Sequence, residues 1–116
     1  MRSPAFYILA SRPYGTLYTG FSTNLYDRMA QHTQGLFDGY TKRYGVKTLV
    51  YYEHYELIDD AIMREKRLED WLRPWKYRII EQMNPAWRNL YDPATGEIFD
   101  GPADVRLLDD ERRFNR

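Results

Sequence analysis

Short segments rich in strand-forming residues open the chain. Residues 5–11 and 16–20 are such segments, and Arg12-Pro13-Tyr14-Gly15 separates them. Proline and glycine supply the backbone geometry of a tight turn, so this stretch predicts an antiparallel hairpin. Residues 46–55, Val-Lys-Thr-Leu-Val-Tyr-Tyr-Glu-His-Tyr, are rich in β-formers and predict a third strand.

Helical periodicity begins directly after the hairpin. The apolar and candidate functional positions that share one helix face, at i, i+3, i+4 and i+7, are Leu25, Arg28, Met29 and His32. Ser22 or Thr23 is the expected N-cap, and Gly35 is the expected stop signal. The pattern therefore predicts a helix that ends near residue 34.

Two further helices are predicted after the third strand. Asp59 or Asp60 opens the first, and Pro74 occupies the first position of the second, which ends at Asn84-Pro85. The complete order is β-β-α-β-α-α. It predicts an α/β (α+β) domain with a small three-stranded antiparallel sheet flanked by helices.

Composition narrows the chemistry. The 116 residues fit one domain, and the chain holds no cysteine and only two histidines. Disulfides, zinc-thiolate sites and cysteine nucleophiles are excluded, so any metal is expected to be a hard, oxygen-bound ion such as Mg²⁺. No stretch approaches the length of a membrane span, and no apolar signal region precedes the first strand. We therefore expect a cytoplasmic protein that does not contact a membrane.

The net charge of zero conceals an uneven distribution. Residues 1–91 hold 13 basic and 10 acidic side chains, whereas residues 92–116 hold 4 and 7. We predict a main domain over 1–91 and a peripheral acidic tail over 92–116, with a turn near Thr95-Gly96 and a weak helix around 103–112. The charge division taken alone also fits ordinary surface variation.

Two charged side chains are predicted to lie among apolar neighbours. Glu65 falls within the apolar stripe of its helix, and Arg28 shares the inward face of the earlier helix. Burial of an unpaired charge is expensive, so each needs a partner. A metal ion or Arg28 would relieve Glu65, and a phosphate matches the bidentate fork of an arginine. A structural salt bridge of Arg28 with Asp27 or Glu65 is the alternative.

A basic and aromatic loop precedes the third strand. The residues that we predict to contact nucleic acid there are Lys42, Arg43, Tyr44 and Lys47. Such side chains can grip a DNA backbone and stack on a base, although a solvated loop has the same composition. The three tryptophans, Trp71, Trp75 and Trp87, are interpreted as core and inter-helix packing.

Five ordered segments resemble one family. They are Tyr7, Thr16-Leu17-Tyr18-Thr19-Gly20, Arg43-Tyr44-Gly45-Val46-Lys47, Ala61-Ile62-Met63-Arg64-Glu65-Lys66-Arg67-Leu68 and Met83-Asn84-Pro85-Ala86-Trp87. With Arg28 and His32 they resemble the GIY-YIG nuclease family over roughly residues 4–91, most closely its small single-domain bacterial members related to the UvrC nuclease module. One departure is clear: Ala5-Phe6-Tyr7 stands where the family has Gly-Ile-Tyr.

The resemblance implies roles for individual residues. Tyr7 takes a proton from the attacking water, Arg28 neutralises charge on the phosphate, and Tyr18 and His32 orient the groups. Glu65 holds the metal, Mg²⁺ or Mn²⁺, while Gly20 and Asn84 support the site. A phenol with a pKa near 10 is a poor base unless nearby positive charge lowers that pKa. We expect these side chains to converge on one open surface.

The resulting prediction is a metal-dependent endonuclease that hydrolyses phosphodiester bonds of DNA, with DNA repair or processing as the setting that the resemblance suggests. A non-catalytic nucleic-acid-binding module of the same fold is the first alternative. A protein-interaction domain that uses its acidic tail and exposed tyrosines is the second.

Overall fold

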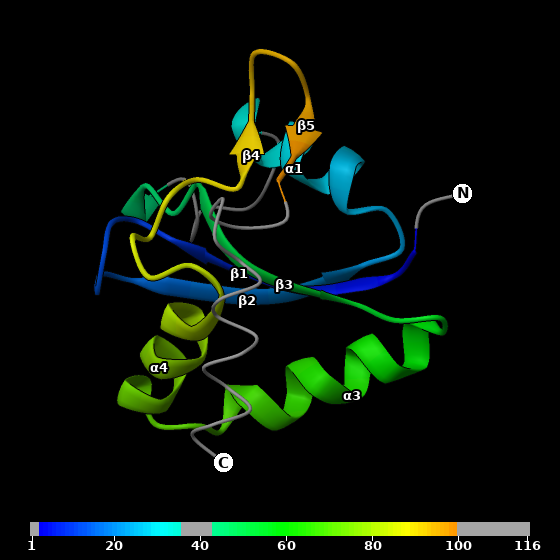
Figure 1. Cartoon of the computed structure of the whole chain (residues 1–116). Helices are drawn as coiled ribbons and strands as arrows, with labels where there is room; N and C mark the ends of the chain where they lie inside the picture. The colour runs from blue at the N-terminus through cyan, green and yellow to red at the C-terminus, as the bar shows by residue number, and fades with distance from the viewer. Residues whose placement is uncertain (1–2, 36–42, 100–116) are drawn as a thin grey trace.

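Three antiparallel strands form the central sheet of the computed structural model, which describes residues 3–35 and 43–99 (Figure 1). The strands β1 (Ala5–Ala10), β2 (Leu17–Ser22) and β3 (Thr48–His54) are ordered β2-β1-β3. The predicted sheet is confirmed. Because β1 is central and β2 is at an edge, side chains of β1 are buried on both faces, whereas β2 has one side open.

Helices cover both faces of this sheet (Figure 1). Helix α1 (Leu25–Thr33) lies on one face, and α3 (Ile58–Glu69) and α4 (Arg73–Met83) lie on the other. The predicted order of strands and helices is confirmed, and with it the α+β class. Helix α4 begins at Arg73, so Pro74 is its second residue and not, as predicted, its first; it still lies in the first turn, where its missing N–H removes no helical hydrogen bond.

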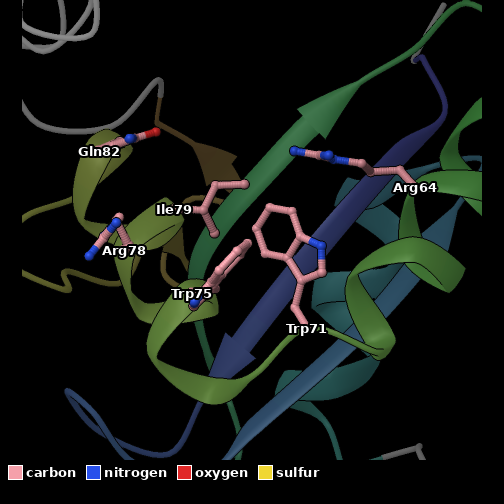
Figure 2. A pocket seen from close by; sticks show the side chains of 6 residues that line it. All are labelled: Arg64, Trp71, Trp75, Arg78, Ile79 and Gln82. Atoms are coloured by element: carbon pink, nitrogen blue, oxygen red, sulfur yellow. The ribbon is translucent and has the colours of Figure 1, made fainter. Parts of the chain in front are cut away.

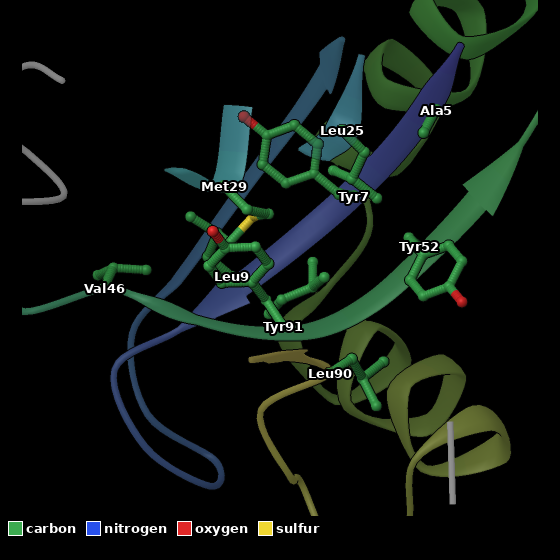
Figure 3. Packing of buried hydrophobic residues seen from close by; sticks show 10 residues of the cluster. Ala5, Tyr7, Leu9, Leu25, Met29, Val46, Tyr52, Leu90 and Tyr91 are labelled. Atoms are coloured by element: carbon green, nitrogen blue, oxygen red, sulfur yellow. The ribbon is translucent and has the colours of Figure 1, made fainter. Parts of the chain in front are cut away.

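Strand alternation divides the buried residues into two clusters. Tyr7 and Leu9 of β1 point toward α1 and pack with Leu25 and Met29, as Figure 3 shows. Phe6, Ile8 and Ala10 point the other way and pack with Leu68, Ile79 and Ile80 of α3 and α4. Odd-numbered residues of β1 therefore face α1, and even-numbered residues face α3 and α4, because successive side chains of a strand point to opposite faces.

Two helix starts differ from their predictions. Asn24, and not Ser22 or Thr23, caps α1: its side chain accepts the N–H of Asp27 at 3.3 Å. Strand β2 continues to Ser22, whose hydroxyl instead bonds the backbone of Asn24 and fixes the turn into the helix. Helix α3 begins at Ile58, one residue before Asp59. Asp59 and Asp60 therefore lie in its first turn, where their negative charges interact favourably with the positive end of the helix dipole.

The chain beyond α4 remains attached to the α1 face. Tyr91–Asp92 (β4) pairs with Glu97–Ile98 (β5) in a hairpin whose turn contains Gly96 at φ 77°. The turn near Thr95-Gly96 is confirmed. Tyr91 is buried and Ile98 packs against the same cluster as Tyr7, so the predicted boundary between 91 and 92 falls inside this hairpin. The predicted helix around 103–112 lies outside the described residues.

The tryptophans do not behave alike. Trp87 is buried among the residues beneath the sheet, as predicted. Trp71 is half-buried, whereas Trp75 is 58% exposed and does not belong to the core, so the core prediction is wrong for it. Its ring still packs edge to face on that of Trp71, with the centroids 5.8 Å apart. Leu68, Ile79 and Ile80 already fill the space below the sheet. Figure 2 shows Trp71 and Trp75 lining an outer pocket of about 280 Å³ between α3 and α4.

Candidate active site

Tyr7 lies at the centre of a polar group on the α1 face. Its hydroxyl is 3.3 Å from Nε2 of His32, and the two rings meet edge to face at 6.0 Å. The Tyr18 ring is 6.3 Å from the Tyr7 ring and 5.8 Å from the His32 ring. Arg28 also interacts with the Tyr7 hydroxyl through its side chain. All four residues predicted to be catalytic are therefore neighbours.

The local fold explains this convergence. Tyr7 pairs with Gly20 and Leu9 with Tyr18 across the β1–β2 ladder, so the two tyrosines point to the same face. Arg28 and His32 are four residues apart on α1 and occupy one helix face above them. Figure 3 shows the Tyr7 ring beside Leu25 of the same helix.

Burial governs the ionisation of Tyr7. The side chain is fully buried, and this burial raises the pKa of its phenol well above 10. The Tyr18 phenol adds to the increase, whereas the charge and hydrogen bond of Arg28 lower the pKa without offsetting burial. The free protein therefore holds Tyr7 protonated at neutral pH. The positive charge expected from the sequence is present, but desolvation is the larger effect.

Gly20 leaves the space that the Tyr7 hydroxyl occupies. A Cβ at position 20 would lie 2.7 Å from the hydroxyl oxygen and 2.8 Å from Cζ of Tyr7. Since Gly20 belongs to the edge strand, the missing side chain lets the Tyr7 phenol extend across β2. The supporting role suggested for Gly20 thus has a concrete steric basis.

We expect Gly20→Ala to destabilise the protein by roughly 1–3 kcal/mol, the usual penalty for an extra methyl group in a packed site. Thermal denaturation of the variant measures this loss. The double variant Gly20→Ala/Tyr7→Phe should recover part of the loss, because the hydroxyl oxygen is the nearest clashing atom. No recovery in the double variant would show that the methyl group is accommodated elsewhere.

Glu65 approaches β2 from the opposite side. It lies on α3, is half-buried, and accepts a hydrogen bond from the hydroxyl of Thr19 at 3.2 Å. Thr19 pairs with Ile8 and so points away from the face of Tyr7. The expectation of a single open surface is therefore wrong: Tyr18 and Thr19 are adjacent in sequence, and their side chains leave opposite faces of one edge strand.

The environment of Glu65 suits a hydrated cation. Burial raises the pKa of its carboxyl, the neighbouring Glu69 adds to this, and Thr19, Lys66 and Lys76 act in the other direction. Among residues 3–35 and 43–99, no three histidine or carboxylate side chains gather to form a metal cluster. A lone carboxylate still fits Mg²⁺, which keeps several waters and completes its shell with substrate phosphate oxygens.

The predicted DNA-contacting loop is described only in part, since Lys42 lies outside the described residues. Arg43, Tyr44 and Lys47 are exposed, and the Arg43 guanidinium lies 5.5 Å from the centre of the Tyr44 ring. This stacking of a cation on an aromatic ring gives the loop a defined polar and aromatic surface.

Asn84 has a structural function. It is fully buried at the end of α4, where its Nδ2 donates to the carbonyls of Val50 and Arg88 and its Oδ1 accepts the N–H of Arg88. These bonds fasten the turn after α4 to β3. These contacts match the interpretation of Asn84 as the residue that ends α4. They match the alternative, a supporting residue beside Tyr7, less well.

The ion pair between Glu53 and Arg64 was not predicted from the sequence. Glu53 of β3 and Arg64 of α3 form a bidentate pair with N–O distances of 2.9 and 3.0 Å. Burial opposes ionisation of Glu53, but hydrogen bonds from Arg64, Tyr51 and Tyr55 outweigh it and lower the Glu53 pKa. Arg64 directly precedes Glu65 on α3. Its position as a second charged residue on the inward side of this helix is the sequence feature that could have indicated the pair.

Comparison with known proteins settles the family. The model of the GIY-YIG catalytic domain matches residues 3–78, which include Tyr7, Tyr18, Arg28, His32 and Glu65. The chain belongs to the GIY-YIG family. This is a family of nucleases that generally use divalent metal ions and act on nucleic acid. The resemblance inferred from the sequence is thereby confirmed.

Curated relatives support this assignment. The UPF0213 proteins of Staphylococcus aureus strains Mu3, Mu50 and N315 are each 35% identical to this GIY-YIG protein over 68 residues, which is 59% of the chain and 83% of the relative. Their name states no activity. No solved structure matches the chain. Within the described residues, no helix is both long and apolar enough to cross a membrane.

Proposed function

We propose that this GIY-YIG protein is a DNA endonuclease that hydrolyses phosphodiester bonds with the help of Mg²⁺ or Mn²⁺. One observation carries the proposal: Tyr7, Tyr18, Arg28 and His32 meet on one side of the edge strand β2, while the Glu65 carboxylate bonds Thr19 on its other side. A phosphate at the open edge of β2 would be approached by both sets of side chains.

Arg28 is the residue best suited to the developing phosphate charge. A guanidinium group carries a positive charge on a planar fork that matches two phosphate oxygens. Donors fixed before the reaction stabilise a transition state without reorganising. Tyr18 and His32 hold the phosphate and the attacking water in place through their polar atoms. Glu65 would hold the divalent cation, which supplies Lewis acidity at the phosphate when bound.

The proposed role of Tyr7 depends on the substrate complex. In the free protein burial keeps its phenol protonated, despite Arg28. We propose that Tyr7 accepts the water proton only when further positive charge at the site opposes the effect of burial. Before that point its hydroxyl keeps the hydrogen bond with Nε2 of His32 and so keeps His32 oriented.

Incubation with labelled DNA tests the proposed function. Single strands, duplexes, flaps and branched DNA should be compared with and without Mg²⁺ or Mn²⁺, with Arg67→Ala as a variant that retains activity and Glu65→Gln as one that loses it. Metal-dependent cleavage by the wild type, absent in Glu65→Gln, supports the proposal. Binding without cleavage under every condition contradicts it.

The burial of Tyr7 favours a second candidate, a non-catalytic nucleic-acid-binding module. A protonated, fully buried phenol is typical of a structural tyrosine that fills a core. In that case the wild type and Glu65→Gln would bind DNA equally and neither would cut it.

A further inference from the structure

A polar pocket of about 430 Å³ lies at the turn between β1 and β2. Its lining comes from three parts of the chain: the turn itself, Tyr44 before β3, and Arg73 at the start of α4. The charged residues in this lining are the two arginines Arg12 and Arg73, and the polar residues Ser11 and Thr16 line it as well. Such a lining attracts an anion.

Hydrogen bonds hold the turn against α4. The hydroxyl of Tyr77 donates to the carbonyls of Tyr14 and Gly15 at 2.8 and 3.3 Å, and the Tyr14 hydroxyl donates to Glu81. Tyr14 itself has φ 59°, a conformation that a non-glycine residue adopts only where its surroundings impose it. Because Tyr77 follows Arg73 by one helical turn, these bonds fix the turn that carries Arg12 beside Arg73.

The pocket also has an aromatic wall. Tyr44 is 48% exposed, so its ring offers a surface on which a planar group can stack. The ligand that fits this lining has a phosphate, which two arginines can bind, and a planar ring, which can stack on a tyrosine. A nucleotide has both groups. In duplex DNA the base would be stacked between its neighbours, so the matching ligand is an unpaired nucleotide.

The pocket continues the candidate active site along β2. Thr16 lines the pocket directly before β2 and precedes Tyr18 by two residues, which is about 7 Å along an extended chain. A strand of DNA whose phosphate lies beside Tyr18 would therefore place an adjacent nucleotide at the pocket.

We propose that this pocket binds an unpaired nucleotide next to the cleaved phosphodiester, with its phosphate on Arg12 and Arg73 and its base on Tyr44. The inference rests on the proposed function and names the part of the substrate that it requires. It makes single-stranded DNA, or a junction with a single-stranded arm, the favoured substrate.

Binding measurements in EDTA test the pocket separately from catalysis. Fluorescence anisotropy would compare a single-stranded octathymidylate with an abasic octamer of the same backbone. Arg12→Ala/Arg73→Ala should weaken binding of both oligomers at least about tenfold, as expected for losing charged hydrogen bonds, and reduce the salt slope by about 0.7 for each phosphate released. Tyr44→Leu should weaken only the base-bearing oligomer, by about tenfold.

Arg67→Ala/Arg88→Ala is the matched control, since it removes two exposed arginines outside the pocket. Equal losses in this control and in Arg12→Ala/Arg73→Ala would overturn the inference, as would a base preference that survives Tyr44→Leu. Thermal melts check that each variant is folded. Failure of the wild type to bind any DNA contradicts the proposed function as well, whereas tight binding by both arginine double variants contradicts the pocket alone.

Discussion

Replacing Glu65 with glutamine is expected to reduce metal-dependent DNA cleavage at least about 100-fold while leaving the fold intact. The proposed cation contributes several kcal/mol to transition-state stabilisation, and each 1.4 kcal/mol is a factor of ten in rate. Glutamine preserves the shape and can still accept the Thr19 hydrogen bond. Initial rates over a range of Mg²⁺ concentrations measure the loss. Glu69→Gln, one turn along α3, is the control and should retain activity.

Stability measurements distinguish this function from a structural role. The Glu65 pKa is raised above its ordinary 4.5, so the folded state disfavours the carboxylate. This unfavourable contribution is absent at low pH and appears as the pH rises through the raised pKa. Glu65→Gln should therefore be as stable as the wild type at pH 7, or more stable. A variant that unfolds, beside a wild type that never cuts DNA, would support the structural alternative.

Glu53 provides the opposite case on a neighbouring element. Its pKa is lowered, so its carboxylate stabilises the fold above its unfolded pKa, and this stability is lost as the pH falls through the lowered value. Glu53→Gln breaks the pair with Arg64 and should cost roughly 2 kcal/mol, which for a domain of this size is about 10 °C in Tm. Similar melting temperatures for the Glu53 and Glu65 variants would contradict this distinction.

The sequence predicted the sheet because its signals are local. The strand-forming residues of β1, the Pro-Gly turn and the helical spacing of Leu25 and Met29 each define an element within a few residues. The relation of Tyr7 to Tyr18 followed from the hairpin, since the turn determines which residues pair. The caps were less certain, because Ser22, Thr23 and Asn24 can all accept an N-terminal N–H.

The side from which Glu65 reaches β2 could not be predicted. Periodicity showed that Glu65 shares the inward side of α3, but it does not say which face of the sheet α3 covers. That choice depends on the path of the chain after β3, and it places α3 opposite α1 (Figure 1). The Tyr7 pKa was beyond sequence reasoning for a related reason: burial outweighs Arg28 only once the packing around β1 is known.

Arg28→Ala is expected to lower the cleavage rate by about 10²–10³-fold, the usual loss on removing one preorganised charge-stabilising group. Arg28→Lys should recover only part of the rate, because an ammonium group retains the charge but lacks the planar fork. Single-turnover rates at saturating DNA measure both variants. Arg67→Ala, which removes an exposed arginine of α3, should stay within about twofold of the wild type.

The pH dependence of the same variants tests how Arg28 acts on Tyr7. Arg28 lowers the Tyr7 pKa through its charge and hydrogen bond, so its removal must raise that pKa further. If Tyr7 accepts the water proton, the rate of Arg28→Ala should keep rising to a higher pH than that of the wild type, and Arg28→Lys should lie between them. Parallel profiles with different heights would restrict Arg28 to the phosphate and remove Tyr7 from the role of base.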